Sequence, residues 1–266
     1  MTAQSHLLLY GCQVAAGEEG GQLIRRLQEV TGADIAASQT LTGNPAGGGN
    51  WELEVTTGNF SIPVIFSPQA QANYAGVFAI IPVTTTVDEN NGTGLVSLRE
   101  AIIQANGTPE DDTIQLVAGQ TYTLNGFTTA GEDNAAQGDL DIIPDSNITI
   151  EVLGEGTATL NGNNTDRIFQ VFPLGSLTFS NLIIENGNVS GTGDNGRGGG
   201  IFNDGTLSIS NSIIRNNLAN HTASAEVGGG IYNSSDATAT LTNILIEGNT
   251  TTGVPGGDGA GFYNAL

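Results

Sequence analysis

The carboxylates best spaced for chemistry are Asp139 and Asp141, and Asp111 with Asp112 forms a second acidic pair. If Asp139 and Asp141 share one strand, they point to the same face, roughly 7 Å apart. That separation suits the acid and the base of an inverting glycoside hydrolase. Two acids at this spacing also arise by chance in an acidic chain. A carbohydrate-active hydrolase is therefore the alternative to a non-catalytic protein.

A lyase of the pectate type needs acids that hold calcium and a basic residue that removes a proton. The chain contains no lysine, and the arginines that occur late in it, Arg167, Arg197 and Arg215, match no evident acidic cluster. We therefore predict no catalytic residues and no enzymatic activity.

The single cysteine, Cys12, follows the apolar run Leu7–Tyr10. This position is similar to that of the nucleophile in caspase-like peptidases, which need a histidine to hold the thiolate. His6 would lie about 20 Å away on the same extended strand, and His221 falls in a distant loop. We predict a buried structural thiol, and one cysteine allows no intrachain disulfide.

Two stretches resemble the start of a calcium site. Asp88–Gly92 has an Asp-X-Asn-X-Gly spacing but lacks the later ligands of a calcium loop, which favours a turn. Gly256-Gly257-Asp258-Gly259 only approaches the calcium-binding nonapeptide. We expect no cofactor and leave calcium open as a ligand of acidic loops.

The charge balance excludes several partners. Six basic residues face 27 acidic ones, for a net charge of −21 and a pI near 4.1. Binding to nucleic acid or to an anionic membrane is disfavoured, and no apolar run is long enough for membrane insertion. The acidic Gly-, Asn- and Thr-rich composition indicates an extracellular or cell-surface location, although no signal peptide is recognised.

The chain repeats itself. The motif Gly198–Asn203 recurs, with small changes, as Gly228–Asn233 and Gly259–Asn264. A second motif, Asn181–Glu185, recurs as Asn211–Arg215 and Asn243–Glu247. A period of about 30 residues is typical of a solenoid. Three short strands per repeat, separated by Asn and Gly, predict a parallel β-helix with coils about 4.8 Å apart.

Stacking of equivalent residues predicts three internal ladders and one polar corner. The corner is formed by Asn181, Asn211 and Asn243. The ladders are Ile168, Ile201, Ile231 and Phe262; Leu177, Leu207 and Leu241; and Ile184, Ile214 and Ile246.

Two features of the repeats have alternative interpretations. Phe202, Tyr232 and Tyr263 turn away from the core, either to pack under a loop or to form a platform for sugars. The polar inserts Asn188–Arg197, Asn217–Val227 and Thr250–Asp258 should project on one side, as a binding face or as idle loops.

Residues 1–58 predict a partial α/β domain. A helix over Glu18–Val30 lies between strands at Leu7–Tyr10 and Ile35–Ala37, and Trp51–Val55 predicts a third strand. This segment resembles the C-terminal half of a domain of unknown function from large bacterial surface proteins that also carry cadherin-like or haemolysin-type repeats. The matching stretches are Leu9–Ala15, Thr31–Ser38, Thr42-Gly43 and Gly48–Glu54. The earlier strands of that family are missing, which predicts an unpaired sheet edge.

A cap precedes the repeats. Residues 59–80 predict a linker, with one strand at Pro63–Phe66, and Ile81–Val87 alternates as a strand does. Ser97-Leu98-Arg99-Glu100 is a capping box, with Val96 and Ala101 as its hydrophobic staple. The helix should end near Ala105 and cover the open end of the first coil.

Ser97–Asn106, Asp112–Leu116 and Thr121–Leu124 resemble the Cys-Ser-Leu-Arg-Glu-Ala domain of bacterial surface proteins, although Val96 stands in place of its cysteine. The resemblance implies right-handed β-helix repeats, and the later phrases are similar to polymorphic outer-membrane-protein repeats. We therefore expect a cap over 81–112 and a right-handed parallel β-helix over 113–266, truncated at its C-terminal end.

These features predict a non-catalytic structural or adhesive segment of a bacterial surface protein. Its expected partners are cell-surface polysaccharides or other surface proteins, met through the polar loops.

Overall fold

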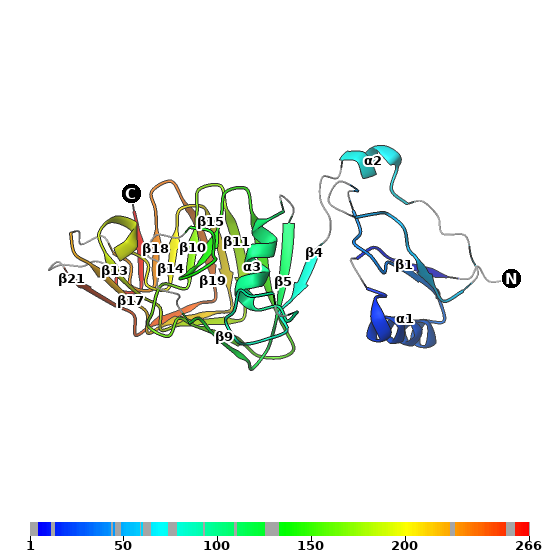
Figure 1. Cartoon of the computed structure of the whole chain (residues 1–266), viewed down its shortest axis with the longest axis horizontal. Coiled ribbons are helices and arrows are strands. Elements are labelled where there is room, and N and C mark those ends of the chain that lie inside the picture. Colours follow the sequence, from blue (N-terminus) through cyan, green and yellow to red (C-terminus); the bar gives the residue numbers. More distant parts are fainter. Residues whose placement is uncertain are drawn as a thin grey trace. The chain divides into compact units, whose positions relative to one another are not determined.

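The computed structural model describes residues 5–11, 14–43, 45, 49–58, 60, 65–73, 79–92, 94–108, 111–125, 133–223, 227–253 and 259–265. The chain divides into two units, Met1–Ile80 and Ile81–Leu266, and Figure 1 colours them along the sequence. Within the described residues, no helix is both long and apolar enough to cross a membrane. Each unit is considered by itself.

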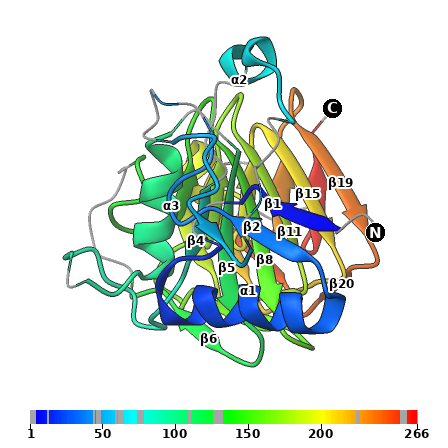
Figure 2. The same cartoon turned by 90° about the vertical axis from the view of Figure 1, so that its right-hand side faces the viewer.

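The first unit contains the predicted strand–helix–strand arrangement. Strands β1 (His6–Leu9) and β2 (Asp34–Ala37) pair in parallel, with α1 (Gly17–Thr31) between them in sequence. Ile24 on α1 and Ile35 on β2 share one buried cluster, and Figure 2 shows α1 lying along this sheet. A glycine ends the helix: Gly32 adopts φ 69° and donates its N–H to Gln28 O.

Other predictions for this unit fare less well. The third strand, β3 (Val55–Thr56), pairs antiparallel with β2 and is short. The predicted strand over Trp51–Val55 is therefore wrong for most of its length. Helix α2 (Pro68–Asn73) lies in the predicted linker. Cys12 and part of the predicted strand Pro63–Phe66 lie outside the described residues.

In the second unit the described strands form four sheets, and the strand pairs described from Asp111 onward are parallel. Sheet I contains β4 (Ala79–Pro82), β5 (Asp111–Val117), β8 (Asn147–Leu153), β11 (Ser176–Ser180), β15 (Thr206–Ser210) and β19 (Thr238–Thr242). Sheet II contains β6 (Thr121–Thr123), β9 (Ala158–Asn161), β12 (Leu182–Glu185), β16 (Ile213–Arg215) and β20 (Leu245–Glu247). Sheet III contains β13 (Asn188–Gly191), β17 (Leu218–His221) and β21 (Thr250–Gly253). Sheet IV contains β7 (Leu140–Ile142), β10 (Phe169–Val171), β14 (Ile201–Asn203), β18 (Ile231–Asn233) and β22 (Phe262–Asn264).

The predicted ladders are confirmed in part. Ile184, Ile214 and Ile246 are in register, as expected. Ile201 pairs with Phe169 rather than with Ile168, so that prediction was one residue out. Ile168 and Phe169 are both apolar and fully buried. Residue type alone therefore could not show which of the two pairs with Ile201.

The ladder of Leu177 and Leu207 continues to Ala239, whereas Leu241 pairs with Ile209. The prediction for Leu241 was therefore wrong. The reason is a turn: Asn233 and Thr238 stand further apart in sequence than the equivalent Asn203 and Thr206. The longer turn moves every later residue of that strand by two positions.

Asparagines fix the corners, as predicted. Asn181, Asn211 and Asn243 have φ of 58°, 48° and 51°, the left-handed region that Asn tolerates. Asn243 Nδ2 donates to Asn211 Oδ1 at 2.7 Å. A second, unpredicted ladder links Asn203 Nδ2 to Asn233 Oδ1 at 2.6 Å and Asn233 Nδ2 to Asn264 Oδ1 at 2.8 Å.

The polar inserts are only partly loops, because each begins with a strand of sheet III. The repeat therefore has four strands where three were predicted. Val189, Ala219 and Val227 form a small buried cluster beneath this sheet. The triple-glycine phrase makes room for it: a Cβ on Gly199 would lie 2.4 Å from Leu218 O and 2.6 Å from Gly229 O.

Helix α3 (Leu98–Asn106) has the predicted capping box. Ser97 Oγ accepts from Glu100 N, and Glu100 Oε2 accepts from Ser97 N at 3.0 Å. The buried face of α3, which includes Ala101 and Ile102, joins the core that continues through sheets I, II and IV. The strand predicted over Ile81–Val87 is instead β4 (Ala79–Pro82), followed by a single bridge from Val87 to Thr123.

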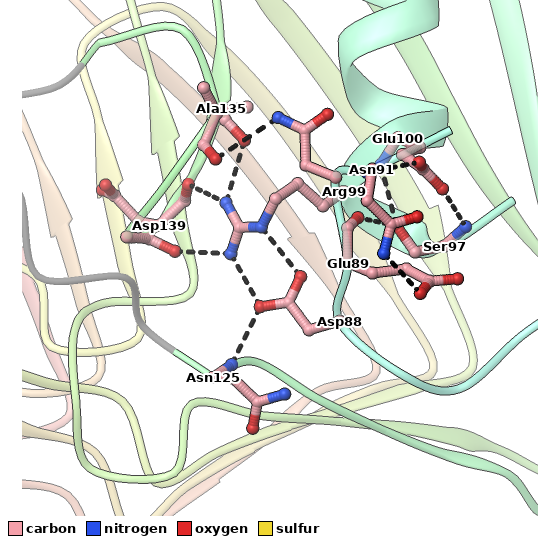
Figure 3. Close-up of polar contacts among 12 residues, drawn as sticks. Asp88, Glu89, Asn91, Ser97, Arg99, Glu100, Asn125, Ala135 and Asp139 are labelled. Carbon is pink, nitrogen blue, oxygen red and sulfur yellow. Dashed lines mark hydrogen bonds and ion pairs between the residues drawn. The ribbon is translucent and has the colours of Figure 1, made fainter. Parts of the chain in front are cut away.

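Arg99 ties α3 to neighbouring segments (Figure 3). Its guanidinium is fully buried and donates to both carboxylate oxygens of Asp88, at 2.8 and 3.1 Å. It also donates to the carbonyl oxygens of Ala135, Gly138 and Asp139. Asn125 N donates to Asp88 Oδ2 at 2.8 Å. The Asp88–Gly92 segment is thus a turn fixed to Arg99, in agreement with the turn prediction.

Candidate functional site

The outward side of sheet IV carries a stack of aromatic rings. Phe202 and Tyr232 lie 5.4 Å apart with nearly parallel planes, and Tyr263 continues the stack at 5.4 Å. Strand alternation aims these rings away from the core, because Ile201 and Ile231 point inward. Consecutive repeats therefore build one continuous aromatic column.

Two arginines cover this column. Arg167 lies 5.3 Å from the centre of the Phe202 ring, and Arg197 lies 4.9 Å from that of Tyr232. Both distances are in the range of cation–π attraction. Phe202 and Tyr232 are only 3% and 4% exposed. The interpretation of these two rings as packed side chains is confirmed, although the cover consists of arginines.

Arg167 also joins an acidic pair. Its Nε lies 2.6 Å from Asp139 Oδ2, with side chains 5% and 10% exposed. Arg167 Nη1 donates to Arg197 O at 3.3 Å, which links the two covering arginines. A Cβ on Gly138 would lie 2.7 Å from Asp166 Oδ2. The Asp166 carboxylate therefore lies against the residue that precedes Asp139.

The electrostatics of this pair are unusual. Burial raises the pKa of Asp139 to about 7, against the lowering effect of Arg167, and the neighbouring Asp166 raises it further. Burial also raises the pKa of Asp166. Raised pKa values at neighbouring carboxyl groups are a common property of acid–base sites.

Two neighbouring hollows open at these residues. One, the Arg167 hollow, has a volume of about 500 Å³ and is lined by Asp139, Asp166, Arg167, Gln170, Asn188 and Thr192, among others. The other, the Arg197 hollow, has a volume of about 690 Å³ and includes Arg197, Asp204, Tyr232, Ser234 and Tyr263. Residues 188–192 and Asn195, from a predicted polar insert, line the first hollow. Both linings are rich in hydrogen-bonding groups.

The two members of each predicted carboxylate pair contact different groups. Asp141 is fully buried and accepts from Ala135 N at 2.8 Å, whereas Asp139 binds Arg167. Asp112 is also buried and accepts from Thr108 Oγ1, and Asp111 accepts from Asn147 on sheet I. Each acid is thus engaged in a separate structural contact.

The remaining candidates are dispersed. Arg215 pairs with Glu185 on sheet II, with Nη2 and Oε2 2.7 Å apart. His6 stacks on Phe60, and His221 is buried in β17. Within the described residues, no group of three or more His, Cys, Asp and Glu side chains is placed to hold a metal ion. The glycine-rich stretch before Gly259 lies outside the described residues.

Sequence reasoning did not select Asp166. It stands next to Arg167, and its carboxylate is brought to Asp139 only because the chain returns one repeat later. The sequence offered no signal for this contact, because it depends on the register of sheet IV, in which Asp141 pairs with Gln170.

A family model described as "Domain of unknown function (DUF4347)" matches residues 1–78. This match agrees with the resemblance of the first unit to a domain of unknown function. No match was found among curated proteins or among solved structures.

Proposed function

We propose that this chain is a non-catalytic structural and adhesive segment of a secreted or cell-surface bacterial protein. In this proposal the second unit is a right-handed parallel β-helix with a cap of the Cys-Ser-Leu-Arg-Glu-Ala type. The Arg167 and Arg197 hollows form its ligand-binding surface, and the ligand is a cell-surface polysaccharide.

The order of the strands supports the β-helix. From β11 onward the chain visits sheets I, II, III and IV in turn, whereas the described strands from β5 to β10 visit sheets I, II and IV. Equivalent strands of successive repeats pair in parallel. Connections between parallel strands are almost always right-handed. The position of α3 over the first strands of the core favours a capping role, which solenoids require.

The observation that carries the adhesive role is the polar groove on the outer side of sheet IV. The guanidinium groups of Arg167 and Arg197 cover its aromatic column. Amide and hydroxyl groups line both hollows. Such a lining offers many donors and acceptors to the hydroxyl groups of a saccharide. The net charge of −21 favours a soluble surface protein over one that binds polyanions.

A carbohydrate-active enzyme is the second candidate, and one observation favours it. Asp139, with a pKa raised to about 7, stands beside Asp166 in the Arg167 hollow. A general acid needs such a pKa. Against this role, the Asp139 side chain is only 10% exposed and is bound to Arg167.

Binding to surface polysaccharides tests the proposal. The 266-residue chain should be retained by at least one immobilised bacterial polysaccharide. Thr192→Trp, which places a bulky ring in the Arg167 hollow, should weaken retention at least about tenfold. Thr159→Trp on the outer side of sheet II is the matched control and should bind like the wild type. Equal binding by both variants, or no retention of the wild type, would refute the groove as the ligand surface.

A further inference from the structure

On the outward side of sheet I, the three strands β11, β15 and β19 carry hydroxyl side chains only, whereas β5 and β8 also present Asp111, Asn147 and Glu151. On β11, β15 and β19 the residues at alternate positions point inward, and those between them point outward. The outward residues are all serine or threonine. This set, which we call the hydroxyl face, comprises Ser176, Thr178, Ser180, Thr206, Ser208, Ser210, Thr238, Thr240 and Thr242.

The strand register turns these residues into a grid. Thr178, Ser208 and Thr240 form the middle row, and the residues two positions before and after them form parallel rows. Neighbouring rungs are about 4.8 Å apart, and residues two apart along a strand are separated by about 6.7 Å. The middle row continues through Thr149 on β8 to Thr113 on β5. Figures 1 and 2 show β11, β15 and β19 side by side.

The hydroxyl face differs from the outer sides of its neighbours. Sheet II presents Glu185, Arg215 and Glu247 at aligned positions, and sheet IV presents the aromatic column. None of the nine positions carries a charge, although the chain has a net charge of −21. Thr206 and the three threonines of β19 are exposed, and the other five residues are half-buried.

We propose that the hydroxyl face binds the surface of ice. Each hydroxyl group both donates and accepts hydrogen bonds, and the sheet fixes their spacing in two directions before any contact is made. The row spacings are of the order of the distances between water oxygens in exposed planes of ice. One such contact is weak, but a rigid grid makes many at once and loses little conformational entropy.

Other periodic partners fit the hydroxyl face less well. A mineral surface rich in divalent cations would need carboxylates, which these nine positions lack. The flat apolar face of a sugar ring would need aromatic side chains, which in this unit line sheet IV instead. An ordered water lattice needs only regular, uncharged hydrogen-bonding groups.

The test uses the full chain in an assay of ice recrystallisation, together with microscopy of single ice crystals. The wild type should slow recrystallisation and alter crystal shape. Ser208→Tyr, at the centre of the grid, should raise the concentration needed for this effect at least about tenfold. Ile213→Tyr, on the outer side of sheet II in the same repeat, is the matched control and should retain the activity. Thermal melts check that each variant is folded.

Thr240→Tyr, at an exposed position on β19, provides a second grid variant if Ser208→Tyr does not fold. The proposal fails if the wild type leaves ice growth unchanged, or if folded grid variants inhibit as well as the wild type. It also fails if the protein instead co-sediments with crystalline cellulose or chitin and grid variants abolish that binding.

Discussion

Arg99 and Asp88 form a two-point ion pair whose side chains are 0% and 2% exposed. The pair ties helix α3 to the turn that follows β4, and the remaining donors of Arg99 bind the 135–139 segment. One guanidinium thus joins the cap to the loop that leads into sheet IV. Arg99, which belongs to the sequence motif from which a cap was predicted, therefore has a structural role.

Replacing Arg99 should destabilise the protein strongly. Arg99→Met leaves Asp88 buried without its partner, and the expected loss is about 3–5 kcal/mol in the free energy of unfolding. Arg99→Lys should rescue little, because a lysine cannot reproduce the planar set of donors. Urea unfolding measures both effects.

The control for this prediction is Glu185→Gln, which breaks the more exposed Arg215–Glu185 pair and should cost no more than about 1 kcal/mol. The double variant Asp88→Asn/Arg99→Met should be more stable than Arg99→Met alone. A cost for Arg99→Met as small as that of Glu185→Gln would contradict the role of Arg99.

Stability should rise as the pH falls through neutrality. Burial raises the pKa of Asp139 to about 7 in the folded chain, above the unfolded value of about 3.9. Its protonated form is thus favoured by folding, and the contribution is complete below about pH 4 and is lost as the pH rises through about 7. Asp166, whose pKa is also raised, acts in the same direction.

Asp139→Asn isolates this effect, because an amide does not titrate. Relative to the wild type, the variant should gain at least about 1.4 kcal/mol between pH 5 and pH 8, the free energy of one pKa unit. Denaturant unfolding at both pH values provides the measurement. A stability difference that is the same at pH 5 and pH 8 would rule out a raised pKa at Asp139.

The triple-glycine phrase should tolerate no side chain at its centre. Gly199→Ala would place a Cβ against the backbone oxygens of Leu218 and Gly229, and such overpacking costs about 1–3 kcal/mol or more. In α1, Gly21→Ala meets only the flexible end of Arg25 at 3.5 Å, and it should stabilise its helix by up to about 1 kcal/mol. Thermal melts of the two variants should therefore shift in opposite directions.

Calcium should leave the melting temperature unchanged beyond the effect of ionic strength. Both carboxylate oxygens of Asp88 are occupied by Arg99, so the stretch that begins like a calcium loop has lost its first ligand. Melts with calcium chloride are compared with melts at equal ionic strength in sodium chloride. A saturable rise with calcium alone would point to a site elsewhere in the chain.

The repeats made much of the second unit predictable. Identical phrases stack on each other, so the pairing of Ile214 with Ile184 and Ile246 followed from spacing alone. The same logic failed at Leu241, because two extra residues in the preceding turn shift the register. It also missed sheet III, whose Asn-, Ser- and Thr-rich strands have the composition of loops.

The candidate site was less accessible to sequence reasoning. Asp139 was identified, but as a partner of Asp141, which is close in sequence and buried. Its actual neighbours, Asp166 and Arg167, arrive from the next repeat. Contacts of this kind depend on the register of sheet IV. The sequence prediction had paired Ile168 with Ile201, and its register for this sheet was therefore wrong by one residue.

The most direct test of the adhesive account follows binding and cleavage together. The 266-residue chain is incubated with insoluble bacterial polysaccharides, and bound protein, new reducing ends and unsaturated products are measured in parallel. The account predicts retention of the protein that Thr192→Trp weakens, with no product released. Release of product that stops in Asp139→Asn would contradict it and identify the Arg167 hollow as an active site.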